Sequence, residues 1–98
     1  MTRDELLDIS TAKIKSTLGV YIPTNVPVYI FGSRSRLDNR WNSDFDLWID
    51  ADLPRSVITA VIEQLEESIV PFKVDLITTD QLSGAFGTEI KREAKRWI

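Results

Sequence analysis

The 98-residue sequence contains neither cysteine nor histidine. Without cysteine, the chain can form no disulfide bond and no thiolate metal site. Without histidine, it lacks the most common general base and the usual zinc ligand. Any metal ion must therefore be bound by oxygen atoms, and oxygen ligands favour magnesium or manganese.

Long apolar runs and an excess of positive charge are also missing. No stretch approaches the about 18 apolar residues of a membrane span. The N-terminus lacks the basic-then-apolar order of a signal peptide, so the expected location is the cytoplasm. The net charge of −3 argues against broad nucleic-acid binding, which depends on a basic surface. The length predicts a single domain, residues 1–98, with one core.

Two helices are expected in the first two thirds of the chain. Thr2 and Glu5 have the spacing of a capping box, and the helix that they open is expected to end at Gly19. Pro54 suits the first turn of a second helix, whose apolar stripe continues to Leu65.

Short apolar runs predict three strands, and the C-terminus is expected to be helical. Gly84 and Gly87 indicate a loop, and residues 90–98 are predicted to form the last helix. The expected strands are residues 28–31, 44–50 and 71–77. This order of elements predicts an α+β fold, a small mixed sheet with helices packed on it.

Three aspartates interrupt the apolar strands. Asp44 and Asp46 are two residues apart, so their side chains project from one face roughly 6.5 Å apart, while Phe45 and Leu47 point into the core. Adjacent carboxylates repel one another, and a divalent cation turns that repulsion into attraction. Asp75, on the third strand, can face the same side. The sequence thus predicts a metal site for phosphoryl transfer, in which two metals about 3.5–4 Å apart stabilise the attacking and leaving oxygens.

A Gly-Ser turn precedes these aspartates. Gly32 lets a phosphate approach the backbone without a Cβ in the way, and Ser33 offers a hydroxyl group. Arg34, Arg36 and Arg40 follow, where they could neutralise a triphosphate. A lone Gly-Ser pair is a common turn. Each arginine taken alone is more often a solvated surface charge. Only the combination with the carboxylates favours nucleotide binding.

Together these residues resemble the nucleotidyltransferase superfamily that includes polymerase beta, in particular its minimal, single-domain bacterial members. Leu37 departs from the family pattern, because a second glycine is usual at that position. The resemblance covers nearly the whole chain. The matching segments are Phe31-Gly32-Ser33-Arg34-Ser35-Arg36, Ser43-Asp44-Phe45-Asp46-Leu47, Val74-Asp75-Leu76 and Ile90-Lys91-Arg92-Glu93-Ala94.

The resemblance implies a role for each motif residue. Asp44 and Asp46 would hold two magnesium ions, and Asp75 would hold the catalytic one and help to activate the acceptor hydroxyl. ATP would be the substrate, and pyrophosphate the leaving group. The residues implied in nucleotide binding are Gly32, Ser33, Arg34, Arg36 and Ser43.

The resemblance also implies a protein partner. Minimal members pair with a helical HEPN-domain toxin, and the implied activity is transfer of AMP from ATP to a tyrosine of that toxin, which would make this chain an antitoxin. Two other functions stay open. One is a binding module of the same fold that neutralises its partner by complex formation. The other is nucleotidyl transfer to a small molecule such as an aminoglycoside.

Overall fold

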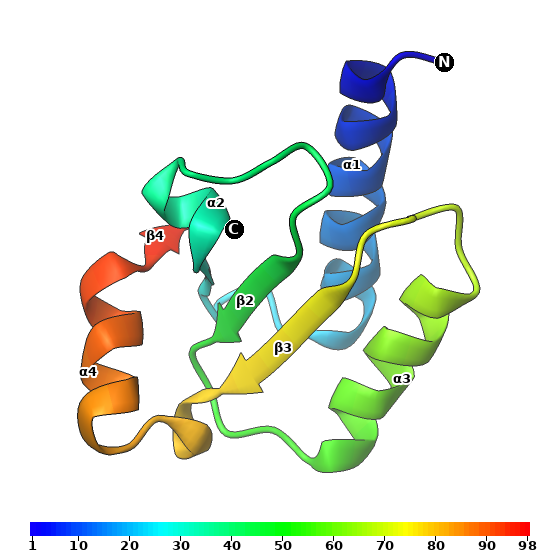
Figure 1. The fold of residues 1–98 in the computed structure, drawn as a ribbon. Helices are drawn as coiled ribbons and strands as arrows, with labels where there is room; N and C mark the ends of the chain where they lie inside the picture. Colours follow the sequence, from blue (N-terminus) through cyan, green and yellow to red (C-terminus); the bar gives the residue numbers. More distant parts are fainter.

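The computed structural model describes all residues 1–98, and four strands form one sheet with helices on both faces (Figure 1). The elements are α1 (Arg3–Tyr21), β1 (Val28–Phe31), α2 (Ser33–Arg36), β2 (Phe45–Ile49), α3 (Arg55–Glu66), β3 (Val74–Thr78), the 3-10 helix η1 (Thr79–Gln81), α4 (Gly84–Glu93) and β4 (Lys95–Arg96). The predicted α+β fold with a small mixed sheet is confirmed.

The sheet has the strand order β3-β2-β1-β4. Strands β2 and β3 are parallel and are connected by α3, whereas β1 is antiparallel to both β2 and β4. Because of these directions, the beginnings of β2 and β3 lie beside the end of β1. This edge of the sheet brings together the Gly-Ser turn and the aspartates.

The main core lies between the sheet and the two helices α1 and α3. Leu47 and Ile49 on β2 are fully buried there, beside Ile14 and Leu18 of α1 and Val61 of α3. Alternation along β2 sends every second side chain to this face, as the sequence pattern predicts.

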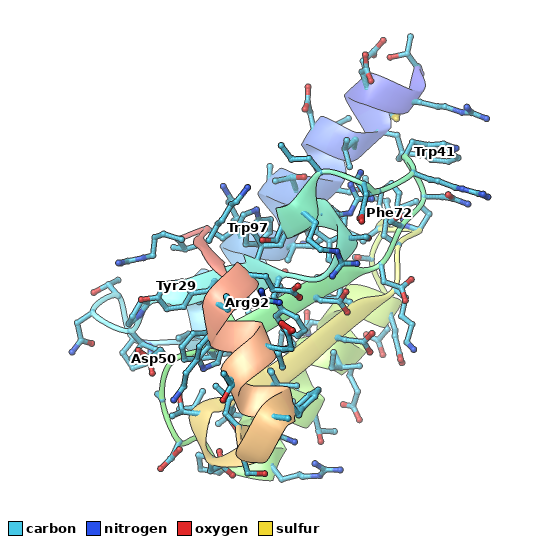
Figure 2. The ribbon with its side chains drawn as sticks, turned by 60° about the vertical axis from the view of Figure 1, so that its left-hand side comes forward. Tyr29, Trp41, Asp50, Phe72, Arg92 and Trp97 are labelled. Atoms are coloured by element: carbon cyan, nitrogen blue, oxygen red, sulfur yellow. The ribbon has the colours of Figure 1, made fainter.

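Helix α4 lies on the opposite face of the sheet, in front of the strands with α1 behind them (Figure 2). Trp48 and Ile90 are buried outside the main core. The Trp48 ring stacks on Tyr29 with ring centroids 4.7 Å apart, and its indole N–H donates to the Thr79 hydroxyl. The second face is therefore only partly apolar, and its open part carries the aspartates.

The first helix starts as predicted but ends later. Thr2 and Glu5 form the capping box. The helix continues through Gly19 to Tyr21, so the predicted end at Gly19 is wrong. A glycine inside a helix costs only about 1 kcal/mol, and burial of Leu18 and Ile22 on either side of Gly19 offsets this cost.

The C-terminal prediction is wrong in two places. Gly84 and Gly87 belong to helix α4 rather than to a loop, and this helix ends at Glu93, after which residues 95 and 96 form strand β4. The Trp97 amide donates to the Val28 carbonyl, and β4 pairs with β1. The edge of β1 would otherwise present unpaired backbone groups, and this pairing satisfies them.

No helix of this structure combines the length and the apolar character that a bilayer crossing requires.

Candidate active site

Asp46 stands at the centre of the candidate site. Its Cα is paired with Phe31 of β1 on one side and with Asp75 of β3 on the other. Neighbouring strands are about 4.8 Å apart, so the register itself places the Asp46 and Asp75 side chains next to each other. Asp44 lies just before β2 and is exposed to solvent.

The turn after β1 touches the Asp46 carboxylate. Gly32 has φ +74°, and a Cβ at this position would lie 2.3 Å from Asp46 Oδ2. Any other residue would therefore be strained in its backbone and would also collide with the carboxylate. The glycine places the Gly-Ser turn directly against the central aspartate.

Negative charge accumulates at Asp46. Burial raises the pKa of its carboxyl to about 6, and the nearby Asp75 and Asp44 carboxylates add to this effect, as does a hydrogen bond with Asp75. The ammonium of Lys73 acts in the opposite direction, and its Nζ lies 3.6 Å from Asp75 Oδ1. Such a carboxylate gains from an additional cation.

The structure contains no group of three or more aspartate, glutamate, histidine or cysteine side chains arranged to hold a metal ion. Asp46 and Asp75 face each other as a pair, and Asp44 influences Asp46 from the exposed start of the strand. The donor chemistry nevertheless fits a hard divalent cation, because all three groups are carboxylates. A cation would also offset the repulsion from Asp75 and Asp44 that adds to burial in raising the pKa of Asp46. Asp44, Asp46 and Asp75 are the residues that could hold such an ion.

Arg34 donates hydrogen bonds to the loop before β2 and so stabilises it. Its Nη2 donates to the carbonyl oxygens of Trp41 at 2.8 Å and Ser43 at 2.7 Å. The guanidinium carbon lies 4.2 Å from the Phe45 ring centroid and 5.4 Å from that of Phe72. The structure thus gives Arg34 protein partners near the carboxylates, where the sequence suggested a phosphate partner.

Ser43 also organises this loop. Its hydroxyl accepts a hydrogen bond of 2.9 Å from the Arg40 backbone N–H. Since Asp44 follows directly, these contacts determine how the loop leads into the first of the three carboxylates.

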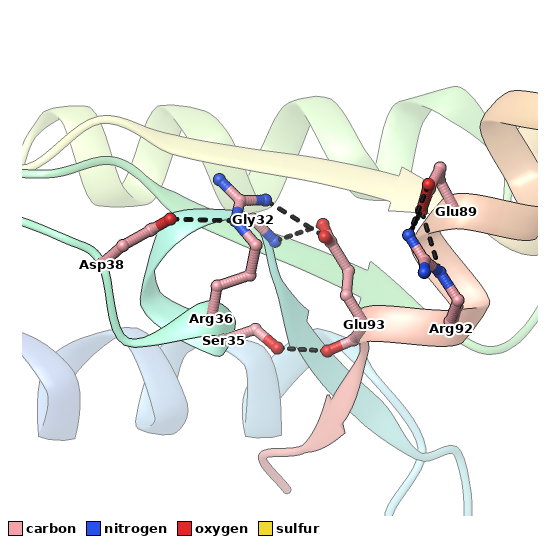
Figure 3. Close-up of polar contacts among 7 residues, drawn as sticks. All are labelled: Gly32, Ser35, Arg36, Asp38, Glu89, Arg92 and Glu93. Carbon is pink, nitrogen blue, oxygen red and sulfur yellow. Dashed lines mark hydrogen bonds and ion pairs between the residues drawn. The ribbon is translucent and has the colours of Figure 1, made fainter.

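Arg36 is held by two carboxylates. It donates from Nη1 to Glu93 Oε2 at 3.0 Å and from Nε to Asp38 Oδ2 at 3.2 Å (Figure 3). Sequence reasoning gave Glu93 no role, although it lies inside the Ile90–Ala94 segment that resembles the family. Because Glu93 is far along the chain from Arg36, only the folded structure reveals their contact.

The fold and this arrangement define a class of protein that transfers nucleotides. The family model for polymerase beta nucleotidyltransferases matches residues 12–97. The chain belongs to this family and is a nucleotidyltransferase. A search among curated proteins finds no match.

Solved structures include several similar complexes. A toxin-antitoxin with AMP-PNP is 27% identical, with a TM-score of 0.69 over 88% of this chain and 70% of that one. A doubly aspartate-to-glutamate mutant of the toxin-antitoxin MntA-HpeT is 25% identical, with a TM-score of 0.66 over the same shares, 88% and 70%. A tri-AMPylated Shewanella oneidensis HEPN toxin in complex with MNT antitoxin is similar in fold, at 24% identity and a TM-score of 0.65 over 92% and 70%.

Proposed function

We propose that this nucleotidyltransferase moves AMP from ATP to a hydroxyl group of a partner HEPN-type toxin in a magnesium-dependent reaction, and that it thereby acts as an antitoxin. Residues 1–98 would act as one domain, in the cytoplasm, where ATP is available. The observation that carries the proposal is the contact between the Gly32 turn and Asp46, which is itself paired with Asp75. The proposed phosphate-binding turn therefore lies directly against the pair of carboxylates, Asp46 and Asp75.

The chemistry divides between the turn and the carboxylates. The Gly32-Ser33 turn binds the β and γ phosphates, with the Ser33 hydroxyl as a donor and no Cβ at Gly32 to keep the phosphates away from the backbone. The acceptor oxygen attacks the α-phosphorus in line, the bond from this phosphorus to the bridging oxygen breaks, and pyrophosphate leaves. The acceptor proton passes to a carboxylate, because the chain has no histidine. Magnesium held by Asp44, Asp46 and Asp75, or manganese in its place, would supply charge neutralisation of the triphosphate.

The similar complexes motivate the choice of acceptor. One neighbour binds AMP-PNP together with a toxin-antitoxin pair, and another contains a tri-AMPylated HEPN toxin. A further MntA-HpeT structure, 26% identical with a TM-score of 0.65, carries a tyrosine-to-alanine substitution. A toxin tyrosine is accordingly the acceptor that we propose for this chain.

The experiment incubates the purified protein with α-labelled ATP, magnesium and the protein encoded by the neighbouring reading frame. We expect label on the partner with the wild-type protein and none with Asp44→Asn. Asp52→Asn is the matched control, because it removes an exposed carboxylate from the loop before α3. Absence of label with the wild-type protein, in magnesium and in manganese, would overturn the proposal.

A binding module is the second candidate function. It is favoured by the engagement of Arg34 and Arg36 with protein groups. In that case the partner is neutralised by complex formation alone. Asp44→Asn separates the two functions, because full neutralisation by this variant supports the binding module and loss of neutralisation supports the enzyme.

A further inference from the structure

One residue of helix α4, Glu93, contacts three residues of the Gly-Ser turn. The Gly32 N–H donates to Glu93 Oε1 at 2.9 Å, and Arg36 Nη1 donates to Glu93 Oε2 at 3.0 Å. The Ser35 hydroxyl donates to the Glu93 backbone carbonyl (Figure 3). These contacts connect the first and last residues of the turn to one side chain and hold Ser33 between them.

The contacts of Glu93 differ from those of an ordinary surface ion pair. The side chain of Glu93 is only 21% exposed. Its carboxyl has a pKa below the ordinary value, chiefly because of the hydrogen bond from the Gly32 amide. One turn earlier on α4, Glu89 pairs with Arg92 only, and the two side chains are 58% and 72% exposed. Helix α4 therefore carries one exposed ion pair, between Glu89 and Arg92, and one partly buried side chain, Glu93, that contacts the Gly-Ser turn.

Gly32 lies between two carboxylates. Its amide is bound by Glu93, while the space that a Cβ would occupy is filled by Asp46 Oδ2. A turn fixed from both sides keeps a constant distance between its backbone and Asp46. Without the Glu93 side chain, the Gly32 amide loses its partner and Arg36 keeps only its bond to Asp38, so the turn is held less firmly against the carboxylate.

We propose that Glu93 is a positioning residue for nucleotide binding, because it holds the Gly32–Arg36 turn against Asp46. The inference rests on the proposed function in one respect, namely that this turn binds the phosphates. Glu93 would act through the turn that it holds. Its loss should weaken nucleotide binding before any transfer takes place.

Calorimetric titration with AMP-PNP in magnesium buffer tests this role directly. We expect Glu93→Ala to weaken binding by about tenfold or more, the equivalent of about 1.4 kcal/mol. Glu93→Gln should stay within about threefold of the wild-type affinity, since its amide oxygen can still accept the Gly32 hydrogen bond. Glu89→Ala is the matched control on the same helix and should bind as tightly as the wild-type protein.

Equal binding by folded Glu93→Ala and wild-type protein would overturn the proposal, as would equal losses in the Gln and Ala variants. If Glu93→Ala does not fold, Glu93→Asp replaces it, because the shorter side chain keeps the charge but draws back from the turn. A weakened Asp variant then supports the role, and an unchanged one contradicts it. The titration needs no acceptor, so an incorrect choice of acceptor leaves it unaffected. Failure of the wild-type protein to bind AMP-PNP would instead count against the proposed function.

Discussion

The two faces of strand β2 are formed by alternate residues of one five-residue strand and have different roles. Leu47 and Ile49 are fully buried against α1 and α3, whereas Asp46 projects from the other face into a half-open region shared with Asp75. The first face gains free energy from the removal of apolar surface from water. The second places like charges together at a cost. The comparison teaches that burial of the core residues offsets the repulsion between the carboxylates and so keeps them close together.

The largest expected effect comes from a change on the core face. Leu47→Ala should destabilise the fold by about 2–5 kcal/mol, because the side chain is fully buried and its removal leaves a cavity. Urea unfolding followed by circular dichroism measures this difference. A loss below about 1 kcal/mol would mean that β2 is packed less tightly than the structure indicates.

Gly32→Ala should have the next largest effect, and it acts on the site face. The new Cβ would overlap Asp46 Oδ2, and a backbone conformation that is essentially restricted to glycine, with φ +74° and ψ −154°, adds about 1–3 kcal/mol of strain. We expect lower stability and a loss of AMP-PNP binding. Gly19→Ala is the matched control, because a Cβ there meets nothing within 4 Å, and it should stabilise the helix slightly. Similar behaviour of the two variants would contradict the close approach at Gly32.

Asp46→Asn should make the metal-free protein more stable at pH 7. The pKa of Asp46 is about 6 in the folded protein, above its ordinary value of 3.8, so the ionised form destabilises the fold. This cost is complete above pH 6 and disappears as the pH falls toward 4, since the folded state then binds the proton. The difference in melting temperature between the two proteins in EDTA should therefore shrink from pH 7 to pH 5. A constant difference would show that the pKa of Asp46 is not raised.

Leu37→Gly should have the smallest effect. Leu37 has φ +64° and a side chain exposed to solvent, so the strain of its left-handed backbone is not offset by burial of the side chain. Glycine adopts this conformation freely but loses more entropy on folding. We expect a net gain of less than about 1 kcal/mol in urea unfolding. A clear loss of stability would mean that the Leu37 side chain packs on the protein.

Local patterns predicted the parts of the molecule that depend on neighbouring residues. The alternation around Asp46 and the capping box at Thr2 are visible in the sequence and present in the fold. The glycine expected by the family at position 37 also has a physical meaning, since the backbone there is left-handed.

Long-range contacts explain what sequence reasoning missed. The last residues form β4 because β1 offers an open edge, and the apolar spacing of Ile90 and Trp97 carries no sign of that edge. Glu93 escaped notice for the same reason, because its partners Gly32 and Arg36 are about sixty positions away. The strands predict three carboxylates at one edge of the sheet, and the structure pairs Asp46 with Asp75 while Asp44 lies at the exposed start of β2.

The most direct measurement of the central claim compares the wild-type protein and Asp46→Asn in the transfer of α-labelled AMP to the proposed toxin partner, in magnesium. We predict label on the toxin with the wild-type protein and none with Asp46→Asn, although the variant stays folded and still binds the toxin. Equal labelling by the two proteins would contradict the assignment of Asp46, and its pair with Asp75, as the centre of the reaction.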